Sequence, residues 1–181
     1  GRFDLIEGDA SGYWELARRI VHGEPYELYT PPRRVLRMPG FPVIIASGIA
    51  CLGERPGAVR CLLALLGTLG CGLVFGLTRT IAGTPAALIA TTAAAISPTF
   101  VVFSVLYLSE TAFAVALVAS LWSLVLLFRR IQPRTVYPQS SSVLQIAALA
   151  TGAGLLAALA THMRPTWIIA SPIAALGAVI V

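Results

Sequence analysis

Two acidic residues stand at positions where a carboxylate could do chemistry. Asp9 lies just ahead of an amphipathic segment, where the free N–H groups and dipole of a helix start favour the ionised form. An ionised carboxylate can act as a general base or bind a metal at neutral pH. Glu110 is the sole acidic residue after Glu54. An ionisable group near mid-membrane costs about 2.5 to 3.5 kcal/mol on insertion scales, which makes Glu110 a functional candidate.

Two arginines could provide the matching positive charge. Arg164 stands before Pro165, between two apolar segments, and its guanidinium could hold a phosphate with paired hydrogen bonds. Arg37 follows Arg33 and Arg34 and precedes a proline-rich turn. These three side chains could contact lipid headgroups or a lipid-linked phosphate.

Each candidate also has a purely structural interpretation. Asp9 or Ser11 could cap the start of the amphipathic helix, and Glu110 could cap the next helix with the help of Ser109. The arginines could be interfacial anchors without a chemical role. His162 is better explained as a helix-end residue than as a catalyst.

The composition indicates a membrane protein. Of 181 residues, 57% are hydrophobic and 12% are charged, against about 25% charged in a typical soluble domain. The mean hydropathy is +0.83. The 13 basic residues are all arginine and give a net charge of +5. Because they flank apolar blocks, they are typical of membrane-edge anchors, and no nucleic-acid partner is expected.

A polar, aromatic-rich segment, residues 1–57, must position Asp9 and Arg37. It contains seven of the eight acidic residues. Its apolar positions fall at helical spacing from Tyr13 to Val21, which predicts a short amphipathic helix on a bilayer surface that ends near Gly23. The apolar stretch 43–52 is too short to cross a membrane, and we interpret it as re-entrant or interfacial.

Residues 58–181 are expected to form a transmembrane helix bundle of about five spans. Ser97-Pro98 should break the second span into two pieces. Gly72 and Gly76 form a small-xxx-small pair that should let two helices approach closely. The three cysteines, Cys51, Cys61 and Cys71, are expected to be inert packing residues. We place the spans near 58–78, 84–106, 110–128, 143–162 and 166–181.

The charge distribution predicts an orientation. The loop 129–134 has three arginines and no acid, which places it in the cytoplasm by the positive-inside rule. Three crossings then put residues 1–57 on the outer face, unless the Pro98 region makes two crossings. The chain opens with Gly1 and closes at Val181 inside an apolar run. We therefore expect a fragment, truncated at its C-terminus, with one or more helices beyond each end.

Motifs of soluble nucleotide chemistry are not found. The sequence has no Walker loop, no dinucleotide-binding glycine fingerprint and no zinc-ligand spacing. The glycines of 67–76 lie in a predicted span and are interpreted as packing residues.

The order of these motifs resembles a known family. Asp9-Ala10-Ser11-Gly12-Tyr13-Trp14, then Arg37-Met38-Pro39-Gly40-Phe41-Pro42, is similar to the first outer loop of GT-C membrane glycosyltransferases. The resemblance is to bacterial relatives of the dolichyl-phosphate-mannose protein mannosyltransferases and the lipid A aminoarabinose transferases. Ser97-Pro98, Leu108-Ser109-Glu110-Thr111 and Arg164-Pro165 follow in the same order.

The resemblance implies a transferase that moves a sugar, with inversion, from a polyprenyl-phosphate donor to an acceptor protein, lipid or glycan at the outer membrane face. Asp9 matches the first-loop aspartate, a base or metal-associated residue, and Glu110 matches a second acidic position. Arg164 and Arg37 are assigned to the donor phosphate. A divalent cation, Mg or Mn, bound through Asp9 is left open, and a bacterial inner (plasma) membrane is implied.

Two other classes of function remain open. In a secondary transporter, Glu110 and the broken span at Pro98 would form a mid-membrane ion or proton site. The long polar first segment argues against that function. In a non-catalytic assembly subunit, neither Asp9 nor Glu110 would be needed for sugar incorporation.

Overall fold

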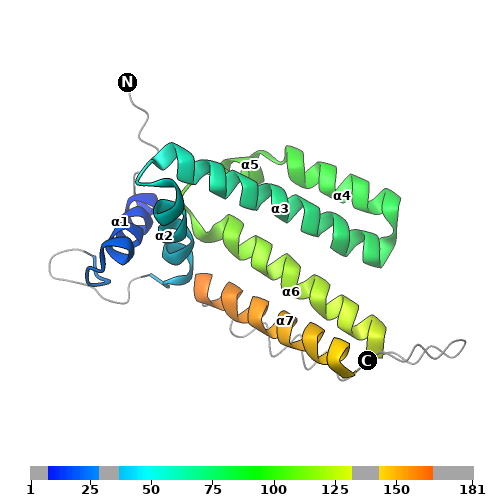
Figure 1. The fold of residues 1–181 in the computed structure, drawn as a ribbon. Coiled ribbons are helices and arrows are strands. Elements are labelled where there is room, and N and C mark those ends of the chain that lie inside the picture. Colours follow the sequence, from blue (N-terminus) through cyan, green and yellow to red (C-terminus); the bar gives the residue numbers. More distant parts are fainter. Residues whose placement is uncertain (1–7, 29–36, 132–142, 165–181) are drawn as a thin grey trace, which may run out of the picture.

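All elements of the described chain are helices, which confirms the all-α prediction for that part. The computed structural model describes residues 8–28, 37–131 and 143–164. The helices in chain order (Figure 1) are α1 (Asp9–His22), α2 (Gly40–Leu52), α3 (Pro56–Ala82), α4 (Thr84–Ile96), α5 (Pro98–Val105), α6 (Ser109–Ile131) and α7 (Val143–Met163). The fifth predicted span, 166–181, lies outside the described residues.

Three helices are long and apolar enough to cross a membrane, namely α3, α6 and α7. They contain 27, 23 and 21 residues. At 1.5 Å per residue these lengths correspond to about 40, 35 and 32 Å, against a hydrocarbon core of about 30 Å. The chain is therefore a membrane protein with at least three candidate spans.

Taken as one bent pair, the helices α4 and α5 make up a fourth candidate span. They are bent by 59° at the Ser97-Pro98 step, where the sequence predicts a break. Pro98 has no N–H to continue the helical hydrogen bonds, and the Ser97 hydroxyl accepts a bond from the backbone N–H of Phe100 at 3.5 Å as the cap of α5. Together, α4 and α5 run once along the length of the bundle (Figure 1). This agrees with the predicted three crossings between residues 1–57 and the loop 129–134.

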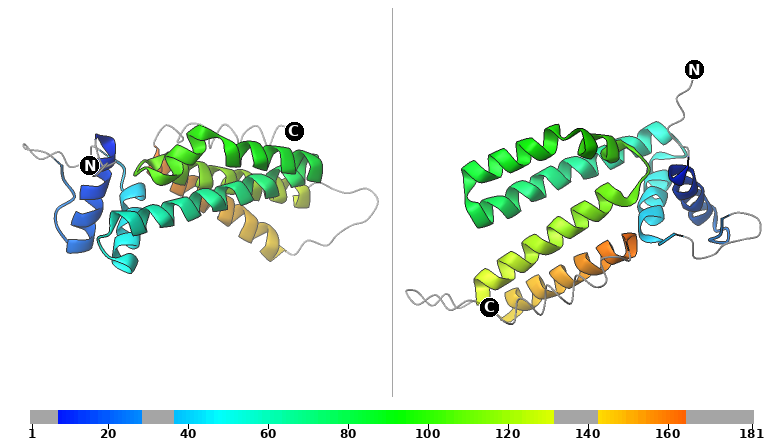
Figure 2. Two further views of the ribbon diagram at one scale, coloured as in Figure 1. Left: turned by 90° about the horizontal axis from the view of Figure 1, so that it is seen from above. Right: turned by 180° about the vertical axis from the view of Figure 1, so that it is seen from behind.

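The spans pack side by side, with α6 between α3 and α7 and with α4 along α3 (Figures 1 and 2). Glycines permit the closest approaches. At Gly67, an added Cβ would lie 2.8 Å from Ser104, and at Gly76 it would lie 2.5 Å from the Trp122 ring. Nothing lies within 4 Å at Gly72. The predicted close approach of two helices is therefore confirmed at Gly76 and wrong at Gly72, because Gly72 points away from the neighbouring helices.

A second layer, α1 and α2, lies across one end of the bundle (Figure 2). Ala10 and Ala17 of α1 are buried in one cluster with Phe41, Ile45 and Ala46 of α2. The amphipathic helix was predicted correctly, and its buried face covers protein. Val21, expected on the apolar face, is exposed.

The start of α1 differs from the prediction. Gly8 is the N-cap, with φ of 60°, and no side chain caps the helix. Asp9 is already the first helical residue, and the Ser11 hydroxyl donates to the Gly8 carbonyl at 2.7 Å. The end is as predicted, since Gly23 adopts φ of 70° and closes the helix.

The cysteines are free thiols. Cys51 and Cys61 are exposed and Cys71 is half-buried. Cys51 and Cys61 thus lie on outward faces of α2 and α3 and do not pack in the described core, and the inertness of the three thiols stays a prediction.

Candidate functional site at one end of the bundle

Asp9 and Arg37 form an ion pair between the start of α1 and the segment that leads into α2. The Arg37 Nη2 atom donates to the Asp9 Oδ1 atom at 2.6 Å. The Asp9 side chain is 72% exposed, whereas that of Arg37 is 12% exposed. A largely buried guanidinium thus presents its charge to a carboxylate that faces solvent.

Aromatic and backbone groups hold Arg37 in place. Its guanidinium lies 4.5 Å from the centre of the Tyr13 ring, an attractive cation–π distance. The Tyr26 hydroxyl donates to the Arg37 carbonyl at 3.0 Å, and burial raises the pKa of Tyr26 to about 12. An added Cβ at Gly12 would lie 3.1 Å from the Arg37 Nε atom, so the missing side chain leaves room for this arginine.

The electrostatics of the pair favour an ionised Asp9. Its hydrogen bond with Arg37, and then the charge of Arg37, lower the pKa of the Asp9 carboxyl below its ordinary value of 3.8. At neutral pH the residue is a carboxylate, the form that a base or a cation ligand needs.

Glu110 and Arg164 form a second carboxylate–guanidinium pair. The Arg164 Nη2 atom donates to the Glu110 Oε1 atom at 2.6 Å. Glu110 lies in the first turn of α6, and Arg164 directly follows the end of α7. The pair therefore joins the two ends of a helical hairpin at the edge of the spans, and not in their middle. His162 lies in the last turn of α7, as expected of a helix-end residue.

An open pocket lies beside Glu110, between the first turns of α6 and the break that separates α4 from α5. Its volume is about 290 Å³ and its exposed lining is almost entirely apolar. The Oε2 atom of Glu110 and the hydroxyl oxygen of Thr111 are buried and have no hydrogen-bond partner. Its lining residues are Ser97, Thr99, Phe100, Phe103, Glu110, Thr111 and Ala114.

The two ion pairs lie at the same end of the molecule. Trp14 of α1 packs against Tyr107, three residues before Glu110, with ring centroids 5.1 Å apart. Tyr107 is fully buried, and its hydroxyl donates to the Pro56 carbonyl at 2.5 Å. On the other side, Gly40 at the start of α2 approaches His162, whose carbonyl oxygen would lie 2.9 Å from an added Cβ.

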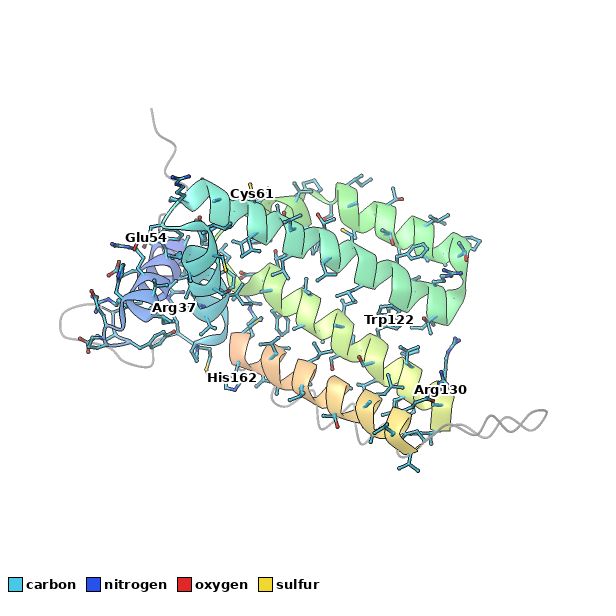
Figure 3. All side chains as sticks on the ribbon, in the orientation of Figure 1. Arg37, Glu54, Cys61, Trp122, Arg130 and His162 are labelled. Carbon is cyan, nitrogen blue, oxygen red and sulfur yellow. The ribbon has the colours of Figure 1, made fainter. Side chains whose placement is uncertain are left out.

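Figure 3 shows the same grouping in side chains. Arg37, Glu54 and His162 lie at the end covered by α1 and α2, and Arg130 lies at the opposite end. The layer of α1 and α2 and the turn before Glu110 thus lie at one end of the bundle. Asp9 does not line the pocket that contains Glu110, so the structure gives each carboxylate its own arginine and not one shared cavity.

A third charged cluster fastens α1 to the turn between α2 and α3. Glu54 accepts from Arg18 at 3.0 Å and contacts His22 at 2.5 Å. These contacts, with His22 first, lower the pKa of Glu54. The cluster is exposed, and its role is best explained as docking of α1.

The sequence analysis gave no positioning role to several residues that hold the site together. Tyr107, Trp14 and Gly40 join the N-terminal layer to the spans, and Thr111 lines the pocket. A tyrosine inside an apolar run is a usable signal, because its hydroxyl needs a partner when buried. Pairings such as Arg18 with Glu54 join distant parts of the chain and leave no local pattern. Arg33 and Arg34 lie outside the described residues.

Comparison of the chain with protein-family models, with curated proteins and with solved structures gives no match. Its functional interpretation therefore depends on the geometry of this site and on the motif order of the sequence.

Proposed function

We propose that this protein is a GT-C-like membrane glycosyltransferase that transfers a sugar from a polyprenyl-phosphate donor to an acceptor at the outer membrane face. The motif order supports the family, and the end of the bundle covered by α1 and α2 supports the site. We further propose that this end, with residues 1–57, faces away from the cytoplasm of a bacterial inner membrane.

One observation carries the proposal: both carboxylate–arginine pairs lie at a single end of the spans, where α1 and α2 provide a polar, aromatic layer. A lipid-linked phosphate lies at such a boundary, because its chain stays in the bilayer and its charged group stays at the surface. Arg164, with 45% of its side chain exposed, can reach that phosphate. Arg37 can add charge while it remains paired with Asp9.

The reaction follows from these groups. An acceptor hydroxyl oxygen attacks the anomeric carbon opposite the phosphate and forms the new glycosidic bond. The bond from that carbon to the phosphate oxygen breaks, and its electron pair leaves with the lipid phosphate. Asp9 takes the hydroxyl proton as general base. Arg164 and Arg37 stabilise the negative charge that grows on the phosphate.

The described residues offer few protein ligands to a divalent cation at this site. In the described ranges, no three His, Cys, Asp or Glu side chains come together as metal ligands. Asp9 would therefore be the protein ligand there for Mg²⁺ or Mn²⁺, which would supply further neutralisation of phosphate charge.

The test is sugar transfer by the full-length protein in lipid nanodiscs, with a radiolabelled polyprenyl-phosphate sugar. Asp9→Asn keeps the size of the side chain but cannot take a proton, and we expect transfer to fall at least 100-fold. Glu110→Gln weakens the ion pair with Arg164 and should also lower the rate of sugar transfer. Glu24→Gln, an exposed acid in the same segment, is the matched control and should retain full activity.

Transfer that is unchanged in both Asp9→Asn and Glu110→Gln would favour a non-catalytic assembly subunit. The transporter alternative receives less support, because Glu110 lies in the first turn of α6 and not at the middle of a span. Solute uptake that is driven by an ion gradient in proteoliposomes, without sugar transfer, would nevertheless favour a transporter over the enzyme.

A further inference from the structure

The end of the bundle opposite α1 and α2 carries positive charge without a matching acid in the described chain. Arg79 lies in the last turn of α3, and Arg129 and Arg130 lie in the last turn of α6. All three are exposed, and within the described ranges none of them pairs with a carboxylate. The sole acid after Glu54 in the sequence is Glu110.

Glu110 is too far away to balance these arginines. It lies in the first turn of α6, about 28 Å from Arg129 at 1.5 Å per residue. Exposed charges interact little beyond a Debye length of about 10 Å at physiological salt. The loop 132–142 that follows α6 adds no acidic residue to the sequence. The compensating negative charge must therefore come from another molecule.

Arg129 brings the charge of α6 to the end of α3. Its Nη2 atom donates to the backbone carbonyl of Thr80, the residue after Arg79. The Thr80 hydroxyl in turn accepts from the Trp122 Nε1 atom of α6 at 3.0 Å, so two bonds join the helices here (Figure 3). Capping a carbonyl at the end of α3 explains the place of Arg129. It does not explain Arg79 and Arg130, which make no side-chain contact of this kind in the described chain.

The surroundings restrict the class of ligand. A guanidinium matches the oxygens of a phosphate group with paired hydrogen bonds. Apolar side chains continue from the same end along α3 and α4, where Ile81, Leu88 and Ile89 are 61%, 57% and 73% exposed. The arginines end two apolar spans, which is the level of lipid headgroups in a bilayer. A ligand with a phosphate and long apolar chains satisfies both surfaces at once.

We propose that the three arginines at the ends of α3 and α6 form a binding site for an anionic glycerophospholipid, with the headgroup phosphate held between Arg79, Arg129 and Arg130. Its acyl chains would lie along the apolar surface of the spans. Basic sites between transmembrane helices bind anionic headgroups in this way. The site lies at the end away from both carboxylate–arginine pairs, so it is independent of the proposed sugar transfer.

The experiment compares two lipids that differ in headgroup charge. The full-length protein, freed of lipid in a mild detergent, is titrated with dioleoyl phosphatidylglycerol and, separately, with dioleoyl phosphatidylcholine, which has the same chains and a zwitterionic headgroup. Native mass spectrometry counts the bound lipids and gives the dissociation constant of the first one. We expect phosphatidylglycerol to bind at least about tenfold more tightly.

Arg130→Gln and the double variant Arg79→Gln/Arg130→Gln test the site. We expect phosphatidylglycerol binding to weaken about fivefold for each charge removed, and about 25-fold in the double variant. Because these two side chains make no described contact within the protein, the unfolding temperature without lipid should not change. Arg55→Gln is the matched control, since Arg55 is also exposed and unpaired but lies just before α3 at the other end. It should retain wild-type phosphatidylglycerol binding.

Two outcomes would overturn the inference. Equal affinity for the two lipids would mean that the apolar surface alone binds them and that the arginines recognise no headgroup. Undiminished phosphatidylglycerol binding in the double variant would mean that the anionic lipid binds elsewhere on the protein.

Discussion

At the scale of single residues, the Asp9–Arg37 pair has a measurable consequence for pH dependence. Arg37 keeps the pKa of Asp9 below 3.8, so the Asp9 carboxylate persists to a lower pH than an unpaired aspartate would allow. The contribution of this pair is fully present above the ordinary pKa and is lost as pH falls through the depressed value.

We therefore predict that Arg37→Gln moves the acidic limb of the pH–rate profile upward, toward 3.8, in addition to lowering the rate. The measurement is kcat/KM for transfer between pH 3 and 8 in nanodiscs. Arg79→Gln, at the far end of α3, removes an equal charge and should leave the limb in place. An acidic limb that does not move in Arg37→Gln would mean that Asp9 is not the group that titrates.

A second residue-scale prediction concerns Tyr107. Tyr107→Phe removes the hydroxyl that bonds the Pro56 carbonyl and leaves the rest of the buried ring in place. We expect unfolding to become easier by about 1 kcal/mol. Thermal unfolding in nanodiscs measures this loss of stability. Tyr26→Phe, which removes the hydrogen bond to the Arg37 carbonyl, serves as the comparison. Wild-type stability in Tyr107→Phe would show that this bond contributes nothing.

The candidate residues could be selected from the sequence, but their partners could not. Asp9 and Glu110 attract attention because an acid is rare in so apolar a chain. Arg37 pairs with Asp9, and Arg164 pairs with Glu110, across 28 and 54 positions of the sequence. Only the fold of the chain brings these partners together. No short-range pattern records such a pairing.

At the scale of elements, α2 is held against the end of α7 by a close backbone approach. An added Cβ at Gly40 would lie 2.9 Å from the His162 carbonyl oxygen. We predict that Gly40→Ala separates α2 from α7 and destabilises the protein by about 1 to 3 kcal/mol. Gly57→Ala, in the open first turn of α3, is the control.

The readouts are the thermal unfolding temperature and the KM for the donor, both in nanodiscs. A loss of stability with a raised KM in Gly40→Ala alone is the expected pattern. Identical behaviour of the two variants would show that the α2–α7 contact is unimportant.

A comparable pair of glycines tests the packing of α3 against α6. Gly76→Ala would place a Cβ 2.5 Å from the Trp122 ring, whose Nε1 atom donates to Thr80 at 3.0 Å. We expect a lower unfolding temperature, equivalent to about 1 to 3 kcal/mol. Gly72→Ala meets no neighbour and should be no less stable than wild type. Equal stability of both variants would contradict the packing.

Element boundaries were predictable where a residue type dictates backbone geometry. Pro98 breaks the second span and Gly23 ends α1, as expected from their permitted dihedral angles. The cap of α1 was not predicted, because Gly8 takes that position with φ of 60°. Which glycines face a neighbour also depends on helix rotation, and spacing alone does not fix that rotation.

At the scale of the whole molecule, the arrangement predicts which segments share a side of the membrane. Starting from a variant without Cys51, Cys61 and Cys71, single substitutions Glu24→Cys and Arg130→Cys place one thiol at each end of the bundle. An impermeant maleimide should label Glu24→Cys in intact cells and Arg130→Cys only after lysis. Labelling of both from the same side would contradict the single passage of α4 and α5.

The positions of α3, α6 and α7 followed from hydropathy and length, since these helices lie within a few residues of three predicted spans. The predicted total of about five spans stays a prediction, because 166–181 lies outside the described residues. The docking of α1 and α2 on one end did not follow from hydropathy. It depends on Trp14 meeting Tyr107 and on Glu54 meeting Arg18, which are contacts between surfaces already formed.

The bend at Ser97-Pro98 has a consequence for the lipids themselves. The hydrogen-bond ladder is interrupted there, because Pro98 has no N–H and the Phe100 N–H bonds the Ser97 hydroxyl. Carbonyl oxygens that lose their helical donors attract water. The carbonyl groups in the last turn of α4 therefore depend on water or on a neighbouring donor, and this flank of the protein is where the apolar surface of the bundle is interrupted.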